Sequence, residues 1–137
     1  MKVPFLSLVA LSFAVLTSGC GLTEKYNKNN SAAQAWLDSN KKASAKANFE
    51  GTYYSPDWGI VNLNQRNGKI TGAMGYSQVK GITGGGTAYI LLVDDQWVGQ
   101  TMILKKKGAE IVEGTYSSEI PYSGKDSQPV HLDRIVN

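Results

Sequence analysis

The sequence predicts an all-β domain, a small antiparallel meander barrel or sandwich of about eight strands, preceded by a short N-terminal helix. From residue 49 onward, β-branched and aromatic residues alternate with polar ones, and turn residues such as glycine recur about every eight to twelve residues, which is typical of such folds. Asn67-Gly68 lies between two of these runs. It is the strongest hairpin signal in the chain, because both positions of the tightest hairpin turn need positive φ.

The expected helix covers residues 31–47. Ser31 and Gln34 have the spacing of a capping box, and the Ala- and Lys-rich sequence that follows favours a helix. Trp36 and Leu37 would give this helix a narrow apolar stripe. Residues 21–30 are polar and show no periodicity, so we expect a flexible tether there.

Eight strands are expected after the helix, over residues 49–55, 59–65, 69–75, 77–83, 87–93, 97–105, 110–117 and 129–136. Several of them have one apolar and one polar face, as a half-buried antiparallel strand does. Val61 and Leu63 form such a face, and Val98, Met102 and Leu104 are expected to form another. The longest loop is expected over residues 118–128.

The run 89–93 is apolar on both faces. We therefore expect its outer side to be covered, and the helix that carries Trp36 is the obvious candidate to cover it. Glycines recur along the expected strands, and regular strand glycines suit the corners of a tightly curved small barrel. These glycines are at positions 72, 75, 81 and 84.

Two short segments, Gly51-Thr-Tyr-Tyr54 and Ile70-Thr-Gly-Ala-Met74, look like known barrel motifs. They resemble the Gly-x-Trp-Tyr and Leu-Thr-Gly-x-Tyr patterns of avidin-like and lipocalin-like barrels, with Tyr53 in place of the usual Trp. The resemblance covers about thirty residues. It implies the barrel architecture, and we carry over no ligand from it.

The N-terminus has the features of an export signal. Lys2 is followed by an apolar run, residues 3–16, that is shorter than the roughly 20 residues a membrane-spanning helix needs. The segment Leu16-Thr17-Ser18-Gly19-Cys20 resembles the lipobox of bacterial lipoproteins, with Thr17 where that family usually has an aliphatic residue. This resemblance implies cleavage before Cys20 and acylation of its thiol and new amino group. Gly21, rather than Asp, then suggests the outer membrane if the source has one.

Charge and composition argue against several functional classes. Removal of residues 1–19 takes away Lys2 and no acidic residue, so the net charge falls from +3 to +2, which is too low to suggest a nucleic-acid partner. His131 is the only histidine and Cys20 the only cysteine, so we expect no metal and no cofactor. Asp133 shares the strand face of His131, and we interpret the two as a solvated pair rather than a catalytic one.

Aromatic residues are the remaining candidates for a binding site. Tyr53, Tyr54, Trp58 and Trp97 could line an apolar pocket or a patch that binds a protein. We expect a lipid-anchored, non-catalytic domain in the cell envelope, on the periplasmic or the surface face, that binds an envelope protein as assembly factors, pilotins or inhibitors do. The alternative is a lipocalin- or avidin-like carrier of a lipid or small hydrophobic ligand, and a third possibility is a hydrolase that works through His131.

Overall fold

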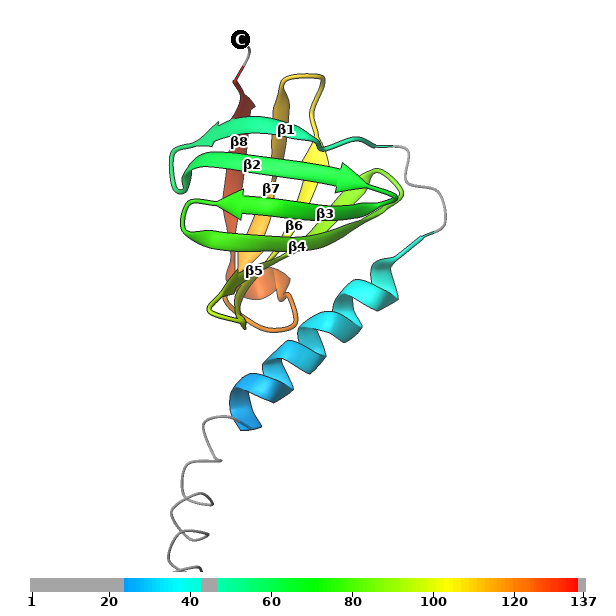
Figure 1. The fold of residues 1–137 in the computed structure, drawn as a ribbon, viewed down its shortest axis with the longest axis vertical. Helices are drawn as coiled ribbons and strands as arrows, with labels where there is room; N and C mark the ends of the chain where they lie inside the picture. Colours follow the sequence, from blue (N-terminus) through cyan, green and yellow to red (C-terminus); the bar gives the residue numbers. More distant parts are fainter. Residues whose placement is uncertain (1–23, 43–46, 136–137) are drawn as a thin grey trace, which may run out of the picture.

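The computed structural model describes residues 24–42 and 47–135. Eight antiparallel strands form a closed barrel in which each strand pairs with the next one along the chain and the last pairs with the first (Figure 1). The strands are β1 (Gly51–Ser55), β2 (Gly59–Arg66), β3 (Lys69–Met74), β4 (Ser77–Gly84), β5 (Thr87–Asp94), β6 (Trp97–Lys106), β7 (Ile111–Ser117) and β8 (Ser127–Arg134). The predicted fold class is confirmed, and the architecture is a barrel rather than a sandwich.

The strand positions agree closely with the alternation in the sequence. Asn67 and Gly68 both have positive φ, 53° and 77°, as the hairpin between β2 and β3 requires. The first strand is expected from residue 49, whereas β1 begins at Gly51. The backbone N–H of Phe49 donates to the side chain of Gln65 instead of to the backbone of a neighbouring strand. The long loop between β7 and β8 contains one short turn of 3₁₀ helix, η1 (Gly124–Asp126).

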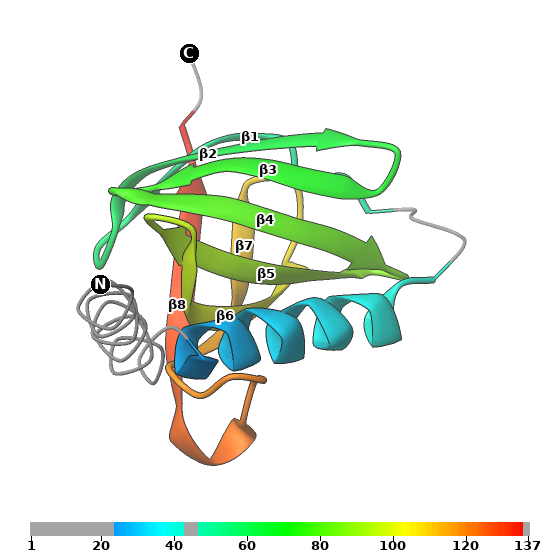
Figure 2. The same ribbon diagram turned by 60° about the horizontal axis from the view of Figure 1, so that its bottom comes forward.

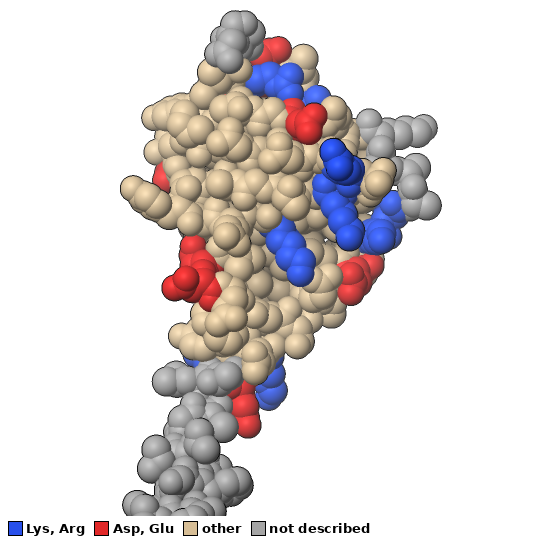
Figure 3. All heavy atoms as spheres, in the orientation of Figure 1, with Lys and Arg blue, Asp and Glu red and all other residues tan. Residues whose placement is uncertain are grey.

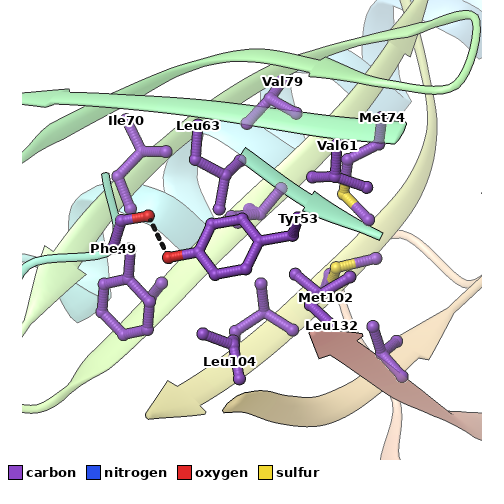
Figure 4. Packing of buried hydrophobic residues seen from close by; sticks show 14 of the residues in the cluster. Phe49, Tyr53, Val61, Leu63, Ile70, Met74, Val79, Met102, Leu104 and Leu132 are labelled. Carbon is purple, nitrogen blue, oxygen red and sulfur yellow. Dashed lines mark hydrogen bonds between the residues drawn. The ribbon is translucent and has the colours of Figure 1, made fainter. Parts of the chain in front are cut away.

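The barrel interior is filled by side chains (Figure 4). Tyr53 lies among them, and its hydroxyl donates to the carbonyl of Phe49 at 2.7 Å, so its one polar atom is satisfied inside the core. The buried cluster consists of Phe49, Tyr53, Val61, Leu63, Ile70, Met74, Val79, Ala88, Ile90, Leu92, Met102, Leu104, Val112, Val130 and Leu132. A ring of eight strands is just wide enough for side chains to fill it.

The expected role of the strand glycines is clearest at Gly72. A Cβ at this position would lie 1.9 Å from the carbonyl oxygen of Asn62 on β2, and the residue has a φ of 138°. Only glycine allows β2 and β3 to approach so closely here.

The helix over residues 24–40 lies outside the barrel, alongside β5 (Figure 2). Ala33 and Leu37 of the helix form a buried cluster with Leu91 of β5 and Val98 of β6. Trp36 packs against this cluster and meets the ring of Tyr89 edge-on, with the ring centroids 5.6 Å apart. The prediction that this helix covers the outer face of residues 89–93 is confirmed.

The predicted start of the helix is wrong, because residues 24–30 are helical rather than a tether and Ser31 is not at a cap. Asn30 explains the difference. Its side chain accepts from the backbone N–H of Val98 and donates to the carbonyl of Gln96, both at 2.9 Å. The ring of Tyr26 packs against that of Trp97 in a tilted arrangement, with the ring centroids 5.1 Å apart. These tertiary contacts outweigh the low helix propensity of the asparagines.

The helix also ends earlier than expected, at residue 40 instead of 47. Ser39 and Asn40 both donate side-chain hydrogen bonds to the carbonyl of Trp36, which satisfies a backbone group of the last turn. The carbonyl of Asn40 lies so close to Gly84 that a Cβ there would approach it to 2.2 Å. Residues 43–46 lie outside the described part of the chain.

Val98 does not share a face with Met102 and Leu104, contrary to the prediction from alternation. Leu92 lies opposite Gln100 and Val93 lies opposite Val98, so Gly99 is an extra residue in β6. Such a β-bulge turns the following side chains to the other face. Val98 therefore packs outside against the helix, whereas Met102 and Leu104 pack inside.

Residues 1–23, which contain the expected signal peptide and Cys20, lie outside the described part of the chain. Among the residues that the structure describes, no helix is both long enough and apolar enough to cross a membrane.

Substitution of Gly72 by alanine should destabilise the barrel by about 2–4 kcal/mol, because the new Cβ would overlap a backbone oxygen and the φ is unfavourable for alanine. Urea unfolding followed by tryptophan fluorescence measures this. Gly86→Ala is the matched control, since a Cβ at Gly86 would meet nothing within 4 Å. An equal loss of stability in both variants would contradict the close-approach explanation.

Candidate functional site

The meander gives the barrel two different ends. The turns β1–β2, β3–β4 and β5–β6 and the loop β7–β8 lie at one end, which we call the Trp97 end. The turns β2–β3, β4–β5 and β6–β7 lie at the other, which we call the Lys69 end. The helix starts at the Trp97 end, where Asn30 binds the β5–β6 hairpin, and finishes at the Lys69 end, where Asn40 contacts Gly84.

The four aromatic residues predicted to form a binding site are not brought together as one patch. Tyr53 is 1% exposed and lies in the core, since alternate residues of β1 face the interior. Tyr54 is 50% exposed on the outer face of the same strand. Trp58 meets the ring of Tyr116 edge-on, with the ring centroids 4.8 Å apart, and Trp97 packs against the ring of Tyr26 on the helix. Both tryptophans are therefore half-buried and already have aromatic partners.

His131 is held between two carboxylates, which extends the pair predicted from the sequence. Its Nδ1 lies 3.1 Å from Glu113 Oε1 on β7, and its Nε2 lies 2.9 Å from Asp133 Oδ1. The hydrogen bond with Asp133 raises the pKa of His131 above its usual value, and Glu113 adds to this against an opposing effect of burial. Both ring nitrogens thus face carboxylates, and neither is placed to take a proton from a hydroxyl group.

The two carboxylates lie on opposite sides of the imidazole ring, so the three groups do not converge on one point. Within residues 24–42 and 47–135, no group of His, Cys, Asp and Glu side chains is arranged to hold a metal ion.

A polar groove opens at the Lys69 end, between the end of the helix and the β2–β3 hairpin. It encloses about 530 Å³. Among the residues that the structure describes, three lysines and no carboxylate line it; two of the lysines come from just after the helix and one from the start of β3. The lining residues are Lys41, Lys42, Asn48, Gln65, Asn67, Gly68, Lys69, Ile82 and Thr83.

A second hollow of about 600 Å³ adjoins the groove on the outer face of β2 and β3 and shares Gln65, Asn67 and Lys69 with it. It adds one cation, Arg66, and one carboxylate, Glu50. We call the two hollows together the basic groove. Figure 3 shows Lys and Arg side chains gathered on this side of the molecule.

Hydrogen bonds hold the walls of the basic groove in place. The side chain of Gln65 accepts from the backbone N–H of Phe49 and donates to the carbonyl of Ala47, both at 2.9 Å, which ties the segment before β1 to β2. The backbone N–H of Thr83 donates to the carbonyl of Gly68 at 2.8 Å, which ties β4 to the β2–β3 turn. These bonds limit how far the backbone around the groove can move.

The cations of the basic groove are not engaged in ion pairs with carboxylates of the described residues. Within the described part of the chain, Lys41, Lys42, Arg66 and Lys69 form no ion pair, whereas Lys107 at the same end pairs with Glu113 at 3.5 Å. Their charges are thus available to an anionic group, and the neighbouring amides offer both donors and acceptors.

The Trp97 end has the opposite character. A smaller hollow of about 380 Å³ there is lined by Asp94 and Asp95, beside the fully exposed Tyr76. Asp57, Glu119 and Asp126 lie in the other connections at this end. The barrel therefore has an acidic end near the start of the helix and a basic end near its finish.

No local pattern in the sequence predicts the basic groove. Lys41-Lys42 and the Arg66–Lys69 hairpin are far apart in the sequence and only meet because the helix lies along β5. The sequence does contain one indication of the groove. Arg66 and Lys69 flank the Asn67-Gly68 turn, which places two cations at the tip of one hairpin.

An NMR titration of His131, the only histidine, should give a pKa above 6.5, and Asp133→Asn should lower it. Because the folded-state pKa is raised, this contribution to stability is complete below a pH of about 6.5. It is lost as the pH rises through the folded-state pKa. The excess stability of the wild type over His131→Gln should therefore shrink from mildly acidic to alkaline pH. A titration with an ordinary or lowered pKa would contradict the two contacts.

The closed barrel agrees in architecture with the avidin-like and lipocalin-like resemblance of residues 51–54 and 70–74. Comparison with known proteins adds no relative: no protein-family model, no curated protein and no solved structure matches the chain.

Proposed function

We propose that the protein is a lipid-anchored lipoprotein of the bacterial cell envelope whose barrel binds a protein partner on its outer surface and catalyses no reaction. One observation carries the choice of binding mode: the interior of the barrel is occupied by its own side chains, including the ring of Tyr53. A barrel with a filled interior offers only its outside to a ligand.

The filled interior also weighs against the alternative function. A lipocalin- or avidin-like carrier of a lipid or small hydrophobic molecule needs a cavity inside the barrel or at its mouth. Met74, Met102 and Leu104 are fully buried in the space such a ligand would take. The hollows described above are lined mostly by polar residues and lie outside the barrel, which suits a protein or another polar ligand better than a hydrophobe.

The anchor is the part of the proposal that rests on the lipobox resemblance of residues 16–20. Cys20 precedes the described helix by only four residues, a distance of at most about 14 Å in an extended chain. With Cys20 in the membrane, the Trp97 end would therefore stay close to the headgroups. The Lys69 end, at the far end of a helix about 25 Å long, would point away from that membrane.

Acylation of Cys20 can be tested directly. Mass spectrometry of the protein purified from its native host should find a mature chain that begins with an acylated Cys20. Cys20→Ser should abolish acylation and move the protein from the membrane fraction to the soluble fraction, because several acyl chains are needed for a stable anchor. An unmodified thiol at position 20 in the wild type would refute the anchor.

Binding of a partner on the outer surface can be tested by photo-crosslinking in cells. A photoreactive phenylalanine derivative is placed at one of three exposed positions on the outside of the barrel, Tyr54, Thr71 or Tyr76. At least one position should give a discrete adduct with a single envelope protein. Lack of any protein adduct, together with a lipid that co-purifies with the protein in native mass spectrometry, would favour the carrier instead.

A further inference from the structure

We infer that the basic groove is the contact site for an acidic, extended segment of the partner protein, an inference that rests on the proposed function for the existence of that partner. The groove combines Lys41, Lys42, Lys69 and Arg66 from two parts of the chain that are distant in sequence. Its two hollows share Gln65, Asn67 and Lys69, so they adjoin at the β2–β3 hairpin.

Charge complementarity defines the chemistry of the occupant. Within residues 24–42 and 47–135, Glu50 is the only carboxylate that lines either hollow, and none of the four cations is engaged in an ion pair. A partner with several carboxylates would meet cations in both hollows. Complementary charge of this kind speeds association and selects against cationic partners.

The acidic Trp97 end strengthens the selection. Asp94 and Asp95 line the hollow at that end, so an acidic segment is repelled there and attracted at the basic groove. This difference in charge between the two ends would orient the barrel with its basic groove toward an acidic partner before any contact forms.

The polar side chains between the cations favour a peptide over a simple inorganic anion. Asn64 and Asn67 offer amide donors and acceptors in the groove, and these match the alternating N–H and C=O groups of an extended backbone. Asn48 adds an amide donor, since its side-chain oxygen accepts from the backbone N–H of Glu50 at 3.0 Å. Gln65 already holds the wall formed by β2 and the segment before β1, so this wall is in place before binding. A wall that is held in place lowers the entropic cost of binding.

The membrane that holds the anchor is not the expected source of the negative charge. The groove lies at the far end of the helix, about 25 Å from the residue at which the helix starts. The potential of an anionic membrane surface falls off within a Debye length, about 8–10 Å at physiological ionic strength. With the helix directed away from the membrane, as proposed above, the groove residues would lie beyond the reach of the lipid charge of the anchoring leaflet.

The test uses the purified full-length chain in detergent and a fluorescein-labelled oligoglutamate peptide, with binding measured by fluorescence anisotropy. The groove variant carries Lys41→Gln, Lys42→Gln and Lys69→Gln. The control variant carries Lys25→Gln, Lys28→Gln and Lys125→Gln, which removes the same charge from three exposed lysines at the Trp97 end. The wild type should bind the peptide, and binding should weaken as salt is added.

The groove variant should bind oligoglutamate about tenfold more weakly than the wild type, whereas the control variant should stay within about twofold. Circular dichroism and urea unfolding check that both variants are folded. Should the triple groove variant unfold, Lys69→Gln alone provides the same comparison, because Lys69 lines both hollows.

Three results would overturn the inference. The first is failure of the wild type to bind oligoglutamate even at low salt. The second is an equal loss of affinity in both triple variants, which would indicate a net-charge effect only. The third is binding to vesicles that contain phosphatidylglycerol, lost in the groove variant, without any binding of oligoglutamate. That result would assign the groove to lipid headgroups.

The outcome of this test is separable from that of the proposed function. Loss of oligoglutamate binding with an acylated Cys20 and a protein adduct at Tyr54 or Tyr76 would reject the groove and leave the partner-binding lipoprotein in place. Groove-dependent peptide binding by a protein whose Cys20 carries no lipid would support the groove as an acidic-peptide site and reject the lipid anchor.

Discussion

Strand β5 is apolar on both faces, and the need to bury both of them determines how the rest of the molecule is arranged. Ile90 and Leu92 point into the barrel, while Leu91 points outward and is only 1% exposed because the helix covers it. Burial of a side chain of this size stabilises the fold by about 1.5–3 kcal/mol. The helix supplies Ala33 and Leu37 for this purpose, with Trp36 at the margin.

The position of the helix then decides which parts of the chain meet. Asn30 bonds to the β5–β6 hairpin at one end of the barrel, and Asn40 lies against Gly84 at the other. As a result, Lys41 and Lys42 lie beside the β2–β3 hairpin and complete the basic groove. The same contact places residue 24, where the described part of the chain begins, at the acidic end. The orientation that we propose for an anchored protein is thus a consequence of how one strand is covered.

The filled interior separates this barrel from those that carry ligands inside. Its side chains are buried hydrophobics, and the hydroxyl of Tyr53 is satisfied by a backbone carbonyl. The recognition that we propose for this barrel would depend on charge and on polar groups held by its strands and turns. On the surface of β7 and β8, apart from the groove, His131 forms hydrogen bonds with Glu113 and Asp133. These hydrogen bonds raise the pKa of His131, so the interaction depends on pH.

The sequence by itself determined the eight strands, the Asn67-Gly68 hairpin and the buried face of Val61 and Leu63, because alternation and turn chemistry are local properties of the chain. It also indicated that residues 89–93 need a cover. Only the tertiary structure decided where the helix starts, that Val98 faces outward and that Tyr53 is core rather than binding surface. The groove likewise depends on pairing and docking between distant segments, which local patterns do not encode.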